Sequence, residues 1–195
     1  DRLVNIYLGV GGNFSDPYKG RNFFNVQAKS GFTEGDNDEN LNSRTDGRGD
    51  VTVFSSSLVR YQNASILDKE VPGFFIMKAA GQFALDRVLS PDQTSIGGFG
   101  TVRGFPLSEF SGDHGYTFSL EYNISFPLKV PVYTGWPKKN VVATLLGFID
   151  HGKVFVEDSE PGEDHQAITG AGFGFKINMP AKDENSLTTS FSLIW

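Results

Sequence analysis

The segment GYTFSLEYNISF, residues 115–126, alternates between apolar and polar side chains after its first residue. Successive side chains of a β-strand point to opposite faces, so this pattern predicts one long strand between two very different environments. The apolar face would consist of Tyr116, Phe118, Leu120, Tyr122, Ile124 and Phe126, and the polar face of Thr117, Ser119, Glu121, Asn123 and Ser125.

Similar alternation recurs along the chain and predicts about eight strands of roughly nine to twelve residues, joined by links of two kinds. The links near residues 13–20, 63–72, 127–140 and 179–186 are short or contain proline, whereas those near 34–49, 86–114 and 153–167 are long and polar or glycine-rich. Strands of about ten residues with alternately short and long links are typical of outer-membrane barrels. The sequence therefore predicts an all-β fold, an antiparallel transmembrane β-barrel. The predicted strands are residues 3–10, 21–32, 50–62, 74–85, 115–126, 141–152, 168–178 and 187–195.

A soluble β-sandwich that acts as a binding module is the alternative, because its strands alternate as well. Strands of soluble proteins are usually shorter, at about five or six residues. The apolar faces predicted here also carry aromatic residues at strand ends, as expected for side chains at a membrane interface. These residues are Tyr61, Tyr116, Phe126 and Trp195. Both observations favour the membrane barrel.

The composition excludes several classes of function. The net charge of −6 disfavours a nucleic-acid partner. The absence of cysteine excludes disulfides, and no apolar run is long enough for a transmembrane helix. The region around Asp36, Asp38 and Asn40 is rich in oxygen ligands but lacks the spacing of a calcium loop. The scattered histidines form no ligand motif, and no serine nucleophile motif occurs, so we expect no metal, no cofactor and no enzymatic activity. The histidines are His114, His151 and His165.

The glycine-rich stretch at residues 96–115 contains a single arginine, Arg103, and no strand pattern. A segment of this length in a compact domain is usually functional or disordered, and its aromatic and apolar residues argue against disorder. Some polar faces of the predicted strands are also too small to fill the interior of a barrel. We therefore expect this loop to fold into the lumen. The small residues are Gly170, Gly172, Gly174, Thr188, Ser190 and Ser192.

Two motifs carry a resemblance to a known family. The sequences GGFGTVRGF at residues 97–105 and GDHGY at 112–116 resemble the VRGF/VRGY loop of the BamA-like outer-membrane superfamily, and FIDHG at 148–152 resembles its strand motif. Residues 81–98 and 168–180 are similar to the two-partner secretion transporter of the haemolysin secretion/activation type. The resemblance covers most of residues 74–195, whereas the first seventy residues agree only in strand pattern.

The resemblance implies a barrel of about sixteen strands preceded by periplasmic POTRA domains, with a loop that folds back into the lumen. The lumen loop motif would be Val102, Arg103, Gly104 and Phe105, and the strand motif that anchors it would be Phe148, Asp150 and Gly152. Arg103 would meet Asp150, since a guanidinium pairs bidentately with a carboxylate. Gly152 would leave room for the backbone of the loop.

The resemblance also implies a location and a function. The protein would lie in the outer membrane of a Gram-negative bacterium, surrounded by lipid, as a monomeric barrel that passes an unfolded secreted polypeptide. A BamA-type insertase, which folds other barrels, is the alternative. Residues 1–195 would form the C-terminal part of the barrel domain without a second domain. Family members have five strands after the glycine-rich loop, whereas four are predicted here. We therefore expect the chain to stop one strand before the end of a complete barrel.

Overall fold

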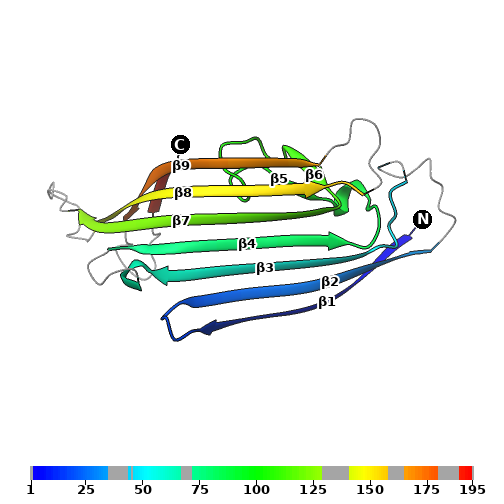
Figure 1. The fold of residues 1–195 in the computed structure, drawn as a ribbon, viewed down its shortest axis with the longest axis horizontal. Helices are drawn as coiled ribbons and strands as arrows, with labels where there is room; N and C mark the ends of the chain where they lie inside the picture. Colours follow the sequence, from blue (N-terminus) through cyan, green and yellow to red (C-terminus); the bar gives the residue numbers. More distant parts are fainter. Residues whose placement is uncertain are drawn as a thin grey trace.

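The structure is a computed structural model that describes residues 2–34, 44, 46–66, 72–128, 141–157, 165–179 and 189–194. These residues form one eight-stranded antiparallel sheet in the order β1-β2-β3-β4-β7-β8-β9-β10 (Figure 1). A separate hairpin, β5 and β6, interrupts the connection from β4 to β7. The predicted all-β antiparallel fold is confirmed. The strands are β1 Arg2–Ser15, β2 Arg21–Glu34, β3 Thr52–Asn63, β4 Phe74–Ala84, β5 Thr94–Ile96, β6 Phe110–Gly112, β7 His114–Leu128, β8 Val141–Phe155, β9 Gln166–Met179 and β10 Thr189–Ile194.

Strands that follow one another in the sequence, with the hairpin set aside, are also neighbours in the sheet. The β1–β2 turn and Ala64–Ile66 after β3 lie at one end of the sheet, whereas β4 ends at the other, where the glycine-rich stretch begins (Figure 1). Among the described residues, two 3-10 helices, η2 Ala64–Ile66 and η3 Ser90–Asp92, lie in the connections. None of the helices in the described residues is long and apolar enough to cross a membrane.

Several strands are longer than the sequence predicts. β1 continues to Ser15, past the expected start of the turn, because Asn13–Ser15 pair with β2. β8 continues to Phe155, into the expected acidic loop, because Val154 pairs with both Gly115 and Gln166. The expected end aromatic Trp195, the polar residue Thr188 and the oxygen-rich group at residues 36–40 lie outside the described residues.

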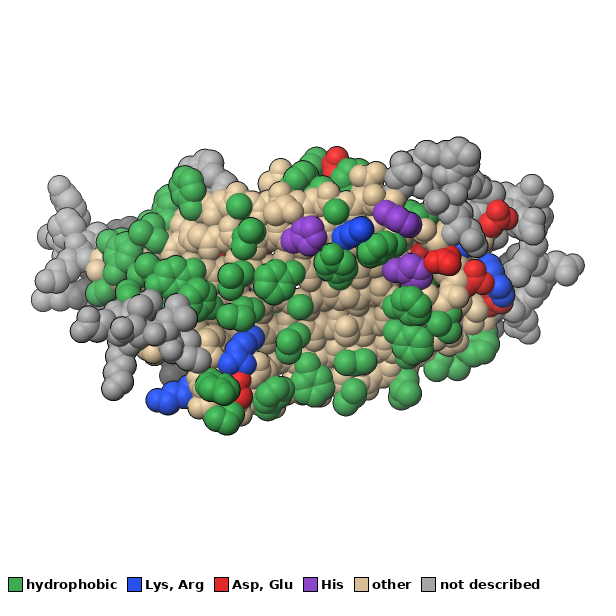
Figure 2. Space-filling model, in the orientation of Figure 1, with side chains coloured by type: hydrophobic (Ala, Val, Ile, Leu, Met, Phe, Trp, Pro, Cys, Tyr) green, Lys and Arg blue, Asp and Glu red, His purple; other side chains and the backbone are tan. Residues whose placement is uncertain are grey.

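The two faces of the sheet are inverted relative to a soluble protein. On β7, Phe118 is 44% exposed, whereas Glu121 and Asn123 on the opposite face are only 7% and 2% exposed. Figure 2 shows apolar side chains spread over the exposed face, with few charged groups among them. We call this the outer face, and the face that carries Glu121 the inner face. A sheet with an apolar, exposed outer face and a polar inner face that is buried along β7 is typical of the wall of a transmembrane barrel.

The predicted position of Tyr61 on the outer face is wrong. Tyr61 is in register with Ile76 and then with Glu121, so it lies on the inner face and is not part of an outer aromatic girdle. Arg60 lies on the outer side instead, where it pairs with Asp16. The central residues of β3 are Ser55, Ser56 and Ser57, so both faces of this strand have mixed character, and its pairing with the neighbouring strands decides which way it faces.

Candidate functional site

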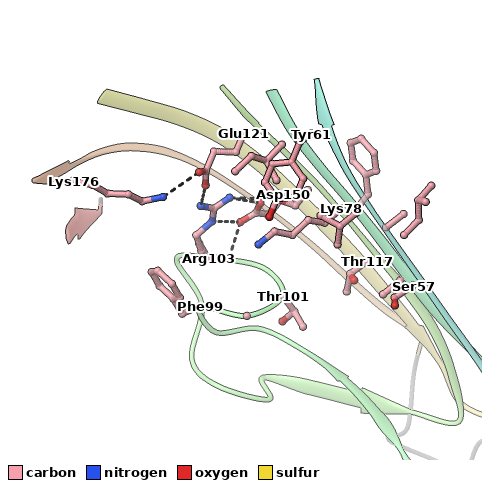
Figure 3. Close-up of a pocket in the computed structure, with 18 residues that line it drawn as sticks. Ser57, Tyr61, Lys78, Phe99, Thr101, Arg103, Thr117, Glu121, Asp150 and Lys176 are labelled. Carbon is pink, nitrogen blue, oxygen red and sulfur yellow. Dashed lines mark hydrogen bonds and ion pairs between the residues drawn. The ribbon is translucent and has the colours of Figure 1, made fainter. Parts of the chain in front are cut away.

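The glycine-rich stretch folds against the inner face of β7, β8 and β9 (Figure 3). Its root is the hairpin of β5 and β6, in which Ile96 pairs with Phe110. Gly98 has a positive φ of 90°, which favours glycine, and its N–H donates to the carbonyl of Phe105 at 3.1 Å. The loop between the two short strands is therefore ordered by hydrogen bonds of its own, and we call it the inner loop, residues 97–109.

Arg103 at the tip of the inner loop binds two carboxylates on the wall (Figure 3). Its Nε lies 2.7 Å from Oδ2 of Asp150 and its Nη2 lies 2.9 Å from Oδ1, which is a bidentate pair. Its backbone N–H also donates to Asp150 Oδ2 at 3.1 Å. Nη1 donates to Glu121 at 2.5 Å, and the guanidinium lies 3.6 Å from the centre of the Phe148 ring. One side chain thus joins the loop to β7 and β8.

Glycines on the wall let the loop approach this closely. A Cβ atom added to Gly170 would lie 2.1 Å from the carbonyl oxygen of Arg103, and one added to Gly152 would lie 3.0 Å from the Val102 side chain. Both distances are shorter than normal contacts, so larger residues would push the tip away from β8 and β9. The small inner-face residues of the two strands form the seat of the inner loop.

The remaining motif residues shape the loop. Val102 is completely buried in a cluster with Ile96, Val154 and Ile168, and Phe105 packs against this cluster. Gly104 has a φ of 94°, a backbone conformation that residues with a Cβ rarely adopt. The structure thus brings all seven predicted motif residues to one place on the inner face: Val102, Arg103, Gly104, Phe105, Phe148, Asp150 and Gly152.

The sequence did not point to Glu121 and Lys176 as members of this site. Glu121 is 9% exposed in its side chain and binds both Arg103 and Lys176, whose Nζ lies 3.3 Å from Oε1. Glu121 is the one charged residue in the polar face of residues 115–126, and that position could have marked it as a site residue. Register was needed to assign its partners, because pairing with β8 sets Glu121 beside Phe148.

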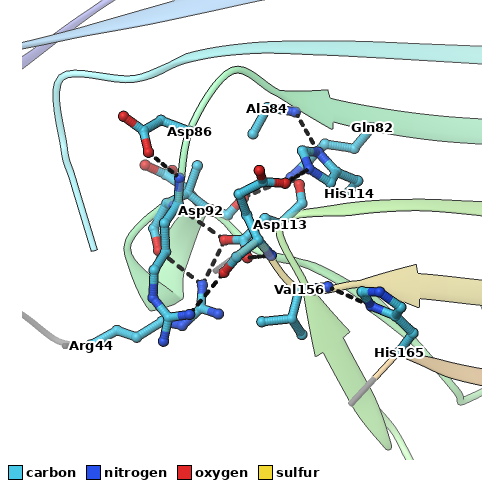
Figure 4. Close-up of polar contacts among 12 residues, drawn as sticks. Arg44, Gln82, Ala84, Asp86, Asp92, Asp113, His114, Val156 and His165 are labelled. Atoms are coloured by element: carbon cyan, nitrogen blue, oxygen red, sulfur yellow. Dashed lines mark hydrogen bonds and ion pairs between the residues drawn. The ribbon is translucent and has the colours of Figure 1, made fainter. Parts of the chain in front are cut away.

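A second buried carboxylate holds the root of the inner loop (Figure 4). Asp113 is completely buried between β6 and β7. Its Oδ1 accepts the N–H of Val88 at 2.9 Å and Nη1 of Arg44 at 2.6 Å, and its Oδ2 accepts the N–H of Glu157 at 2.9 Å. Burial alone would raise the pKa of Asp113, but these hydrogen bonds outweigh it and hold the pKa below its ordinary value. Asp113 therefore connects three separate segments.

The histidines make structural contacts. Nδ1 of His114 accepts the N–H of Ala84 at 3.1 Å, and Nδ1 of His165 accepts that of Val156 at 3.3 Å (Figure 4). His151 lies 2.8 Å from the hydroxyl of Thr169. Within the part of the chain that the structure describes, no three acidic or histidine side chains are grouped to hold a metal ion.

The family model for the haemolysin secretion/activation protein ShlB/FhaC/HecB matches residues 18–177 of the chain. The chain belongs to this family. The predicted resemblance is thereby confirmed and extends further toward the N-terminus than the motifs alone indicated. The family consists of transporters of the outer membrane of Gram-negative bacteria, so the predicted location is confirmed as well.

CdiB from Escherichia coli is similar in structure. The match has a TM-score of 0.69 at 17% sequence identity and covers 99% of this chain but 33% of CdiB, so the chain spans about a third of that protein. At this identity the likeness concerns the fold. No curated protein sequence matches the chain. The fold match and the one large sheet that the described residues form show that the soluble β-sandwich alternative is wrong, because a sandwich would cover the apolar face of that sheet with a second one.

Proposed function

We propose that the protein passes an unfolded, secreted polypeptide across the outer membrane, through a barrel to which the described sheet contributes. The observation that carries this proposal is the inner loop, held by Arg103 against a polar face whose reverse side is apolar and exposed. Lipid would contact the outer face, and the polypeptide would contact the inner one. The barrel would be monomeric and would act without catalysis or a cofactor.

The inner loop would be the moving part. In the docked state Arg103 satisfies Asp150 and Glu121, which are both buried. Removing one partner from a buried ion pair costs about 3–5 kcal/mol, so the docked loop is held firmly until something replaces these contacts. A passing polypeptide would favour the displaced state, which makes the loop a two-state element. The glycines of β9 would then present a surface without bulky side chains to the passing polypeptide.

A BamA-type insertase would use a similar loop to fold other barrels. The match to haemolysin secretion/activation proteins supports secretion over assembly. We therefore propose the secreted polypeptide as the partner that enters the lumen.

The first experiment removes the anchor. Arg103→Ala and Asp150→Ala should each reduce the amount of secreted polypeptide in the medium while the amount of transporter in the outer-membrane fraction stays nearly unchanged. Arg48→Ala is the matched control, since Arg48 is an exposed arginine that pairs with Asp50 and Asp86. Wild-type secretion by both anchor variants would show that the docked inner loop does not control the passage of the polypeptide.

A second experiment fixes the loop in place. The close approach of Val102 to the Cβ position of Gly152 suits a disulfide between Val102→Cys and Gly152→Cys, and the chain has no cysteine of its own. Secretion should stop in the oxidised protein and return after reduction. Because reduction restores the free loop in the same molecules, recovery excludes a folding defect. Continued secretion by the oxidised protein would refute a moving loop.

A further inference from the structure

Lys78 of β4 lies in the same cross-strand row as the anchoring aspartate. It pairs with Ser119 of β7, which pairs with Asp150 of β8. All three therefore lie on the inner face, with a small serine between the two charged residues. Figure 3 shows the Lys78 side chain extending toward the Arg103–Asp150 pair, on the opposite side from Lys176.

The charges around this site do not balance while the loop is docked. A cavity of about 300 Å³ is lined by Lys78, Arg103 and Lys176 and by two carboxylates, Glu121 and Asp150. Arg103 binds both carboxylates, and Lys176 binds Glu121. Lys78 is exposed and makes no hydrogen bond or ion pair with any described residue. It is a cation held near Arg103 without a carboxylate of its own.

Removal of Arg103 changes this balance. Two lysines and two carboxylates remain, and Lys176 already binds Glu121. Asp150 would then be a carboxylate of the inner face that has lost its counter-ion, which is unfavourable. Neighbouring strands lie about 4.8 Å apart, so the backbones of Lys78 and Asp150 are separated by about 10 Å across β7. The four-carbon stem of lysine and the aspartate side chain can span this gap over Ser119.

We propose that Lys78 is the alternative counter-ion of Asp150, which replaces Arg103 when the inner loop leaves the wall. Lys78 is a positioning residue in this scheme: it stabilises the displaced state and so sets how readily the loop is released. The proposal rests on the proposed function, because it assigns a role in the movement of the same loop. It adds the group that keeps the wall neutral while the lumen is open.

The test is a double-mutant cycle, measured as urea unfolding of the full-length protein in liposomes. Lys78→Met should leave the wild-type protein unchanged or slightly more stable, since it removes a cation near Arg103. In the Arg103→Ala protein the same change should lower the folded-to-unfolded ratio roughly fivefold or more, because Asp150 loses its remaining counter-ion. Lys78→Arg should keep the stability of the Arg103→Ala protein.

Lys153→Met is the matched control, because Lys153 lies on the outer face of β8 over the Phe155 ring. Its effect should be equal in both backgrounds. If the Arg103→Ala/Lys78→Met protein fails to fold, adding Asp150→Asn should restore folding, since a neutral amide needs no counter-ion. An equal effect of Lys78→Met in both backgrounds, or no rescue by Asp150→Asn, would overturn the proposal. Failure of the proposed function has a different readout, namely wild-type secretion by Arg103→Ala.

Discussion

Asp150 and Asp113 are both almost completely buried, at 1% and 0% exposure, yet they are satisfied in different ways. Asp150 belongs to the wall and receives a guanidinium from the tip of the inner loop, together with one N–H of the same residue. Asp113 belongs to the root of the loop and receives two backbone N–H groups from other segments, together with Arg44.

We expect this difference to separate a releasable contact from a fixed one. The guanidinium and the backbone N–H that donate to Asp150 both belong to Arg103, so a shift of the loop tip removes these three hydrogen bonds together. The partners of Asp113 come from the segments around Val88, Glu157 and Arg44, which would have to move apart. We therefore expect the inner loop to have a fixed root and a tip that can leave. The following predictions test this division, beginning with the largest effect.

Asp113→Ala should have the largest effect on stability. It leaves the N–H groups of buried Val88 and of Glu157 without their acceptor and removes the carboxylate partner of Arg44, at a cost of about 3–5 kcal/mol. The measurement is the free energy of unfolding in urea from liposomes. Asp50→Ala is the control, because Asp50 forms an exposed pair with Arg48 that should contribute at most about 1 kcal/mol. A loss no greater than that of Asp50→Ala would mean that the root is not fixed by Asp113.

Gly170→Ala should detach the tip while the root stays in place. The added methyl group would overlap the carbonyl oxygen of Arg103, and the loop must shift at a cost of about 1–3 kcal/mol. Amide hydrogen exchange should speed up in residues 97–109 and stay slow at Asp113. Gly147→Ala is the matched change on β8, where the nearest atom lies 4.0 Å from the added Cβ. Equal protection of the loop in both variants would contradict the steric role of Gly170.

Arg103→Lys should have a smaller effect, because it keeps the charge and removes the planar, bidentate geometry and the stacking on Phe148. The loss should be about 1.5 kcal/mol, the contribution of one hydrogen bond to a charged group. Secretion should fall between that of the wild-type and Arg103→Ala proteins. Secretion equal to that of Arg103→Ala would show that bidentate geometry, rather than charge, holds the tip.

The sequence predicted the tip much better than the root. Alternation over residues 115–126 was enough to assign a strand and its two faces, and the family resemblance carried by two motifs implied that Arg103 meets Asp150. These features are local, or belong to a recurring pattern. The partners of Asp113 come from residues 44, 88 and 157, and two of its three contacts are to backbone N–H groups, which no residue type identifies.

The register between neighbouring strands explains why the sequence alone did not place Glu121 in the site or Tyr61 on the inner face. Glu121 joins the site because β7 pairs with β8 in one alignment, and Tyr61 faces inward because β3 pairs with β4 in one alignment. A shift of one residue would turn either side chain to the other face. In residues 115–126 the apolar face is regular enough to fix this choice, whereas the three serines of β3 leave it open.

The smallest predicted effect is a pH dependence of the root. The native pKa of Asp113 lies below its ordinary value of 3.8, so protons bind more readily to the unfolded chain. The stabilisation by Asp113 is therefore complete above about pH 5 and is lost as the pH falls below about 4, through the native pKa. A nitroxide on Ser111→Cys, an exposed position in β6, should become more mobile over that range. Asp113→Asn should abolish this transition, because an amide does not titrate. If the transition persists in that variant, other carboxylates cause it, and the root does not depend on the charge of Asp113.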